Sequence, residues 1–337
     1  MAVWLWLGWT YYEGMTFGDH TLPLAADTLR TWALDESLKA NVMANPVLAS
    51  AAGRIARRFM AGETTTDALT LIAKNAHRGH LTSIECAGES VRSEEIANKE
   101  TGIFTTLIAE MKTRDELATV SFDLSHIGSV VSPVLGLTNA LAIAEAARDA
   151  GTYIMISAES SERTDLVLDL YEKVSDAFEE TGITIQARLH RSPADLQRVM
   201  QRPGPIRLVK GAFLENSTVA HPRESNELTD AYLAMAQTLV TDGHRVNLAT
   251  HDSSMVESLK SRLGQKLKGA HVEFEMLQGL GTELLDSLSN EGYATREYVL
   301  FGSEWWLYVL NRMAEHPERV ITALADLNQA ADFGNGK

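Results

Sequence analysis

Cysteine is almost absent from this chain of 337 residues, which contains only Cys86. A single cysteine excludes an intramolecular disulfide, a CxxC redox motif and a cysteine-rich zinc site, and it is compatible with a reducing compartment. Basic residues are also scarce, since 30 Lys and Arg stand against 45 Asp and Glu for a formal net charge of −15. Because an acidic surface disfavours a phosphate backbone, we expect no nucleic-acid partner.

Long apolar runs are missing as well. The apolar start, residues 3–9, is far shorter than the roughly 20 residues that span a bilayer, and it lacks the basic beginning of a signal peptide. We interpret residues 1–20 as a hydrophobic N-terminal extension, with Met15 as an alternative natural start. No other segment resembles a membrane span, so we expect a soluble, cytoplasmic protein. Peripheral contact with a membrane stays open.

Helical patterns dominate residues 21–117. Residues 64–67 (TTTD) are typical of a helix start, and Leu69 and Ile72 follow at helical spacing on one face. We expect an N-terminal helical region here, packed on the domain that follows.

From residue 118 onward, short β-branched or apolar segments alternate with helix-length segments, which is typical of βαβ units. The strand candidates are residues 118–124, 153–158, 183–187, 206–209, 246–250, 271–276 and 296–300, with residues 217–221 as an eighth. Eight such units over residues 118–330 favour an α/β fold of the closed (β/α)₈ type. No GxGxxG motif follows any of these segments, which weighs against a Rossmann fold.

Polar residues gather at the ends of these strand candidates, where barrels of this type hold their chemistry. Alternation along residues 118–124 places Ser121 and Asp123 on the face opposite Val120 and Phe122. Because helices cover the outside of a barrel, we expect the polar face to point inward. Further polar residues expected at strand ends include Glu159, Glu275, Arg296 and Tyr298.

Two segments are more specific. In residues 207–213 (RLVKGAF), Arg207 and Lys210 place two cations near a strand end, and Gly211 lets a ligand approach the backbone. This pattern predicts a site for an anion or an electron-rich ring.

The second segment, residues 298–312, ends a strand and opens a helix. Tyr308, Arg312 and Glu315 lie on one face of that helix at i, i+4 and i+7, with Asn311 beside them. An aromatic ring, a guanidinium and an amide presented together can hold a small polar molecule.

These two segments resemble the proline dehydrogenase family of flavoenzymes, whose barrel carries R-L-V-K-G-A-Y and closes with a tyrosine strand followed by E-W-Y-P-Y-x-x-R-R. Residues 56–64, 87–91 and 273–281 resemble the family too, and residues 250–252 (THD) resemble its T-H-N. The resemblance covers about residues 45–330. It implies a distorted (β/α)₈ barrel that binds FAD, oxidises proline at its C–N bond to a cyclic imine, and passes electrons to a quinone or another acceptor.

Carried over position by position, the resemblance also implies site residues. The flavin contacts would be Ser157, Gln186, Arg207, Val209, Lys210, Gly211, Ala212, Thr250, His251 and Glu315. The substrate side would comprise Leu277, Tyr298, Tyr308 and Arg312, together with three departures from the family pattern, Asp123, Arg188 and Asn311.

The departures alter the family's clamp for the substrate carboxylate. The lysine with which the family binds the substrate carboxylate is replaced by Asp123, and its two paired arginines correspond to Asn311 and Arg312. Ser157 replaces an aspartate of the family, and Arg188 replaces its usual tyrosine. Since charged hydrogen bonds contribute about 1.5–3 kcal/mol each, losing two would weaken proline binding by orders of magnitude. We therefore expect a related amine or imino substrate, with Asp123 paired either with an arginine or with the substrate amine.

Other interpretations stay open. True L-proline oxidation requires a rebuilt clamp of Arg188 and Arg312, and a retained fold without activity would make the protein a non-catalytic scaffold. Lys210 at a strand end also suits a Schiff-base lyase. Metal-dependent hydrolysis is weaker, because the chain has no HxH or HExxH spacing, and we expect no metal.

Overall fold

The computed structural model describes residues 20–88 and 90–329. They form two compact units, one of residues 57–305 and one that combines the described residues up to 56 with those from 306 onward. The predicted N-terminal extension lies, except for His20, outside the described residues.

Eight parallel strands close a barrel in the larger unit, paired in chain order with β8 returning to β1. The strands are β1 (Leu81–Cys86), β2 (Thr119–Phe122), β3 (Ile154–Ile156), β4 (Thr181–Gln186), β5 (Ile206–Val209), β6 (Val246–Ala249), β7 (Val272–Leu277) and β8 (Thr295–Phe301). The predicted (β/α)₈ fold is confirmed.

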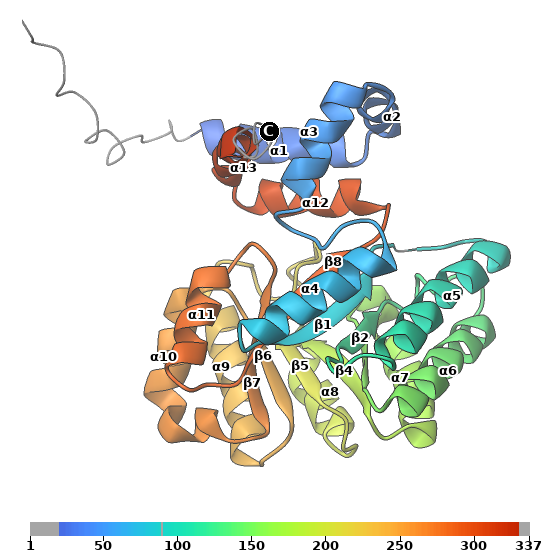
Figure 1. Cartoon of the computed structure of the whole chain (residues 1–337). Helices are drawn as coiled ribbons and strands as arrows, with labels where there is room; N and C mark the ends of the chain where they lie inside the picture. The colour runs from blue at the N-terminus through green and yellow to red at the C-terminus, as the bar shows by residue number, and fades with distance from the viewer. Residues whose placement is uncertain (1–19, 89, 330–337) are drawn as a thin grey trace, which may run out of the picture. The chain divides into compact units, whose positions relative to one another are not determined.

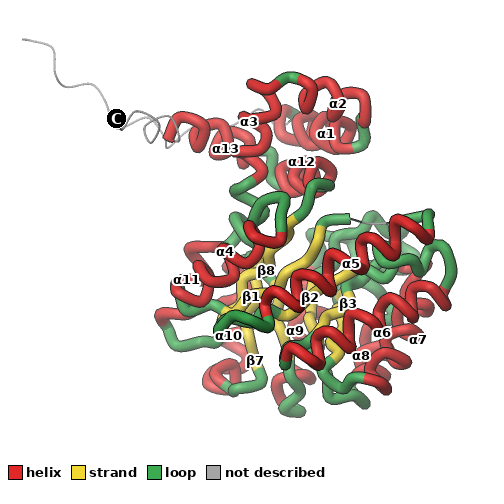
Figure 2. Tube along the Cα trace, turned by 45° about the vertical axis from the view of Figure 1, so that its right-hand side comes forward, coloured by secondary structure: helices red, strands yellow, loops and turns green. Residues whose placement is uncertain are grey.

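Helices α4 to α11 surround the strands, as Figures 1 and 2 show. They are α4 (Thr65–His77), α5 (Glu94–Met111), α6 (Pro133–Ala150), α7 (Thr164–Ala177), α8 (Ser192–Val199), α9 (Asn226–Thr241), α10 (Ser253–Leu263) and α11 (Thr282–Asn290). The start predicted for α4 is confirmed, because the Thr64 and Asp67 side chains form a reciprocal capping box.

The two faces of β2 divide as the alternation predicts. Phe122 points outward, and its ring centroid lies 5.9 Å from that of Phe104 on α5. Ser121 points inward, where its hydroxyl accepts a hydrogen bond from Arg207 at 2.9 Å. Apolar residues therefore fill the layer between strands and helices, while polar residues fill the interior of the barrel.

The predicted eighth strand at residues 217–221 is wrong. In that segment only Ala220 makes an isolated antiparallel bridge, to Leu189. The missing strand is β1, in a segment that we expected to be helical, so the barrel does not begin at residue 118. Because β1 turns Ser83 and Glu85 toward the polar interior, it lacks the apolar run by which the other strands were found.

The smaller unit is helical. It contains α1 (Thr21–Ala33), α2 (Glu36–Ala44), α3 (Pro46–Ala56), α13 (Arg319–Gln329) and α12 (Trp305–Glu315) from its second residue onward. Helix α13 packs on α3, and the indole of Trp306 donates a hydrogen bond to the Trp32 carbonyl at 2.9 Å. The barrel domain predicted for residues 118–330 therefore also ends too late. Across residues 20–88 and 90–329, no helix is both long and apolar enough to cross a membrane.

Candidate active site

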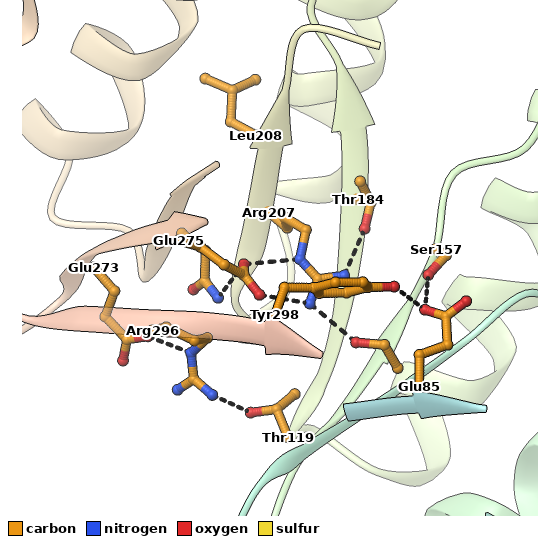
Figure 3. A network of polar contacts seen from close by, with 12 residues as sticks. Glu85, Thr119, Ser157, Thr184, Arg207, Leu208, Glu273, Glu275, Arg296 and Tyr298 are labelled. Atoms are coloured by element: carbon orange, nitrogen blue, oxygen red, sulfur yellow. Dashed lines mark hydrogen bonds and ion pairs between the residues drawn. The ribbon is translucent and has the colours of Figure 1, made fainter. Parts of the chain in front are cut away.

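Arg207 organises the interior of the barrel. Its Nε and one Nη donate to the two carboxylate oxygens of Glu275 at 2.8 and 2.9 Å, and the same Nη reaches Ser121 at 2.9 Å (Figure 3). Asn247 donates to Glu275 at 2.9 Å. A bidentate, fully buried arginine–carboxylate pair of this kind fixes both side chains. Arg207, which we predicted near the strand end, is thus the second residue of β5 and is committed to Glu275.

Tyr298 connects this pair to a second carboxyl group. The guanidinium of Arg207 lies over the Tyr298 ring, 4.5 Å from its centroid. The Tyr298 hydroxyl donates to Glu85 Oε2, which also accepts a 3.0 Å hydrogen bond from Ser157. Glu275, Arg207, Tyr298, Glu85 and Ser157 therefore form one connected polar network from five different strands or strand ends (Figure 3).

The two carboxyl groups of this network differ in their electrostatics. Burial opposes ionisation of Glu275, but the charge and hydrogen bonds of Arg207 outweigh it and hold the pKa of Glu275 below its ordinary value. Burial dominates at Glu85 and raises its pKa, against the opposing hydrogen bond from Tyr298 and the charge of Arg207. Burial and the neighbouring Glu85 charge raise the pKa of Tyr298 well above its ordinary value.

Asp123 and Leu277 lie at the same end of the barrel as Tyr298. Asp123 follows β2 directly and is half-buried, and its charge contributes to the raised pKa of Tyr298. Leu277 is the half-buried last residue of β7. The structure thus brings Ser157 and Tyr298 together on Glu85, a residue that sequence reasoning missed, and places the charge of Asp123 near Tyr298.

Lys210 follows β5 and pairs with Asp252, with Nζ 2.6 Å from Oδ2. The other carboxylate oxygen of Asp252 caps α10 by accepting from the backbone of Ser254 and Met255. Burial opposes ionisation of Asp252, but the Lys210 and Ser254 hydrogen bonds hold its pKa well below the ordinary value. Thr250 and His251 follow β6 and immediately precede Asp252 in the chain.

Gln186, Arg188 and Gly211 form a close group at the ends of β4 and β5. The Gln186 amide donates to the Glu159 carbonyl at 2.8 Å, while its buried Oε1 has no partner among the described residues. Gly211 has φ 109°, and a Cβ there would lie 2.8 Å from Arg188 Cδ and 3.0 Å from Gln186 Oε1. The positive φ and these close side chains restrict position 211 to glycine, and the buried Gln186 Oε1 is left for a donor other than the described residues.

Arg188 is buried, with 4% of its surface exposed. Its guanidinium donates to the carbonyl oxygens of Phe213 and His221, the latter at 3.1 Å. These bonds hold the segment after β5 in place. In the barrel unit, Arg188 is therefore engaged by backbone, which leaves only its Nε without a hydrogen-bond partner among the described residues.

Arg296, which we expected at the catalytic end, is instead the second residue of β8 and lies toward the opposite end of the barrel. It pairs with Glu273, with Nε 2.6 Å from Oε2, and donates to Thr119 at 3.0 Å. This end of the barrel serves stability in folds of this type.

The remaining predicted residues lie on α12, in the smaller unit. Tyr308, Asn311, Arg312 and Glu315 are helical, as the spacing predicts, and are half-buried. Arg312 lies over the Tyr308 ring, 5.6 Å from its centroid, and its Nη2 is 2.8 Å from Glu315 Oε1. The helix thus presents an arginine that is already paired with a carboxylate.

Metal ligands are not grouped in the described part of the chain, where no three His, Cys, Asp or Glu side chains are placed to hold an ion. Val209 and Ala212, the other two residues predicted to contact flavin, flank Lys210 and Gly211 in the segment after β5.

Comparison with known proteins connects this barrel to one family. The family described as Proline dehydrogenase matches residues 68–315. Proline dehydrogenase 1 of Bacillus subtilis (strain 168) is 32% identical over 267 residues, covering 78% of this chain and 87% of the relative. Proline dehydrogenase of Deinococcus radiodurans is 30% identical over 269 residues, covering 78% and 86%.

A solved structure gives the same fold. Proline utilization A (PutA) from Bdellovibrio bacteriovorus, inactivated by N-propargylglycine, has a TM-score of 0.71 at 18% identity. It matches 86% of this chain, which spans 36% of the length of the PutA chain. The family match begins inside α4 and includes β1, in agreement with a barrel that starts before residue 118. The chain is a divergent member of the proline dehydrogenase family.

Proposed function

We propose that the protein is a flavin-dependent oxidoreductase that oxidises a C–N bond of proline or of a related amine to an imine. Membership of the proline dehydrogenase family supports the reaction class. Gln186, Gly211 and Lys210 support the cofactor, because they combine a buried acceptor without a partner among the described residues, a backbone with positive φ and a cation. FAD, when bound, supplies the acceptor for the hydride.

Within the barrel, the residues that we assign to FAD are those at the strand ends. The family pattern also includes Glu315, which lies on α12 of the smaller unit. Lys210 would offer positive charge to the ring system, as cations stabilise a reduced flavin. Thr250 and His251 would contact it from β6. A quinone or another carrier would then accept the electrons, as the family resemblance implies.

Within the barrel, we assign the substrate side to Asp123, Tyr298 and Leu277. The family pattern also assigns Tyr308, Asn311 and Arg312 to the substrate, and these residues lie on α12 of the smaller unit. The barrel residues favour an amine over a carboxylate. Asp123 and Glu85 are both acids, and Arg207, whose charge acts on Glu85, is neutralised by Glu275. We therefore propose a substrate related to proline whose amine, rather than a carboxylate, is held by the barrel.

Proline itself is the second candidate, with Arg312 as the main carboxylate contact. Schiff-base chemistry at Lys210 is disfavoured by the ion pair with Asp252, because an ammonium group held by a carboxylate is not a free amine nucleophile.

Anaerobic mixing of the yellow holoprotein with proline or pyrrolidine tests the proposal. Bleaching of the flavin by either compound supports amine oxidation, and a colourless protein that cannot be loaded with FAD contradicts it.

A further inference from the structure

Glu85 is an exception among the buried carboxylates of the described chain. The others each lie in an ion pair with an arginine: Glu275 with Arg207, Glu297 with Arg78, Glu159 with Arg163 and Asp195 with Arg191. Glu85 is only 7% exposed, yet within residues 20–88 and 90–329 no lysine, arginine or histidine lies at ion-pair distance from it. A buried carboxylate without a cation carries a desolvation cost that the charge of a bound cation would partly offset.

One oxygen of Glu85 is also available. Oε2 accepts both hydrogen bonds, from Tyr298 and from Ser157, whereas Oε1 accepts none from the described residues (Figure 3). A carboxylate accepts hydrogen bonds at both oxygens. The Tyr298 and Ser157 contacts therefore orient the group and leave Oε1 for a donor that the described residues do not supply.

The described groups around Glu85 do not neutralise its charge. Tyr298 reaches it from β8 and Ser157 from the end of β3, and both are neutral. The charges that act on it are Arg207 on β5, which is bound to Glu275, and His126 after β2, which lies 3.1 Å from Glu100. Asp123 adds a second negative charge near Tyr298.

We propose that Glu85 is a catalytic residue that binds the ammonium group of the substrate through Oε1 and takes its proton. This inference rests on the proposed amine oxidation and names the group that recognises the amine. It predicts a cationic secondary amine as the substrate class, held by Glu85.

The proton and electron balance is simple. A secondary ammonium has no lone pair, so its N–H bond breaks first and an O–H bond forms on Glu85. The C–H bond then breaks, its electron pair leaves as hydride to the oxidant, FAD, and the nitrogen lone pair forms the C=N bond of the protonated imine. A raised pKa suits a carboxylate for this role, since a proton acceptor works best when its pKa approaches the working pH.

The test uses two five-membered rings that each carry one of the two functional groups of proline. Pyrrolidine has only the amine and cyclopentanecarboxylate only the carboxylate. Their binding to the holoprotein is measured by calorimetry, which does not depend on flavin reduction. We expect pyrrolidine to bind and Glu85→Gln to weaken it by about 10- to 100-fold, the effect of losing one charged hydrogen bond.

Controls separate charge from folding. Glu180→Gln removes a like charge from a partly exposed carboxyl that pairs with Arg245, and it should leave pyrrolidine binding unchanged. Glu85→Asp keeps the charge and should retain part of the affinity. If Glu85→Gln does not fold, the comparison uses two other variants. Loss of pyrrolidine affinity in Glu85→Ala, together with retained affinity in Glu85→Asp, would equally show that the charge of Glu85 binds the amine.

The pH dependence gives a second readout. In the wild type, flavin reduction by pyrrolidine should rise with pH until Glu85 is ionised and then level off. In Glu85→Gln it should rise throughout with the fraction of free amine. Equal pyrrolidine affinity and an unchanged pH profile in Glu85→Gln would overturn the role of Glu85 while leaving flavin-dependent oxidation intact, whereas a wild type without flavin would overturn both.

Discussion

Arg207 and Tyr298 are stacked inside the barrel, with the guanidinium carbon 4.5 Å from the ring centroid. Each partner is held at its far side by a carboxyl group, Arg207 by Glu275 and Tyr298 by Glu85. The position of the Tyr298 ring, which the family pattern assigns to the substrate, therefore depends on an ion pair between β5 and β7.

Arg207→Met should destabilise the fold strongly, because it leaves Glu275 charged, buried and without its cation. Removal of one partner of such a pair costs about 3–5 kcal/mol. Adding Glu275→Gln should recover much of the loss, since the amide keeps an acceptor for Asn247. Urea unfolding of the single and double variants measures both effects. A single variant within about 1 kcal/mol of the wild type would be incompatible with this pairing.

Stability should respond to pH in opposite ways at Glu85 and Glu275. The pKa of Glu275 is lowered in the folded state, so its contribution is present above the unfolded pKa and is lost as the pH falls through the folded value. The pKa of Glu85 is raised, so its ionisation destabilises the fold as the pH rises. Glu85→Gln should therefore gain stability relative to the wild type at pH about 8 but not at pH about 4.

Urea unfolding at the two pH values checks this sign. A constant difference between Glu85→Gln and the wild type across that range would show that Glu85 does not titrate differently in the folded and unfolded chains.

Gly211→Ala should lower the flavin content of the purified protein. Both the positive φ of 109° and the 2.8 Å approach of the new Cβ to Arg188 oppose the substitution, and the displaced backbone lies where we place the cofactor. Gly243→Ala is the matched control, because Gly243 also has a positive φ, 72°, but its Cβ would meet nothing within 4 Å. Both should lose at least about 1 kcal/mol of stability from strain, with the larger loss at Gly211, and only Gly211→Ala should lose flavin.

Asp123→Lys combined with Asn311→Arg should move activity toward proline. The double change restores two of the cations that the family uses for the substrate carboxylate, each contributing about 1.5–3 kcal/mol, so kcat/KM for proline should rise by at least about tenfold. Steady-state kinetics with proline and pyrrolidine measure the shift. A double variant that binds FAD normally without any gain on proline would argue against the altered clamp.

The sequence predicts the barrel because its outward-facing residues alternate with the strand period and its helices separate the strands. It fails at β1, where the inward-facing Ser83 and Glu85 interrupt the apolar pattern, and that failure hides Glu85 from the predicted site. Motif resemblance identifies the residues around Lys210 and Gly211. It does not predict that Arg207 is committed to Glu275 or that Lys210 pairs with Asp252, because those partners are more than forty residues away along the chain.

Distance along the chain also explains why the role predicted for Arg188 differs from its contacts in the structure. Its position after β4 suggests a substrate contact, but its guanidinium is bound to the carbonyl oxygens of Phe213 and His221, which only the folded loop after β5 brings near. Long-range pairing of charges is set by the closed barrel and not by local pattern.

The absorption spectrum of the purified protein, followed by anaerobic addition of pyrrolidine and then proline, tests the central claim most directly. Amine oxidation predicts flavin bands at about 370 and about 450 nm, bleached by pyrrolidine at lower concentration than by proline. A protein that shows no flavin bands after incubation with FAD, or whose bands persist with both amines, would contradict the account.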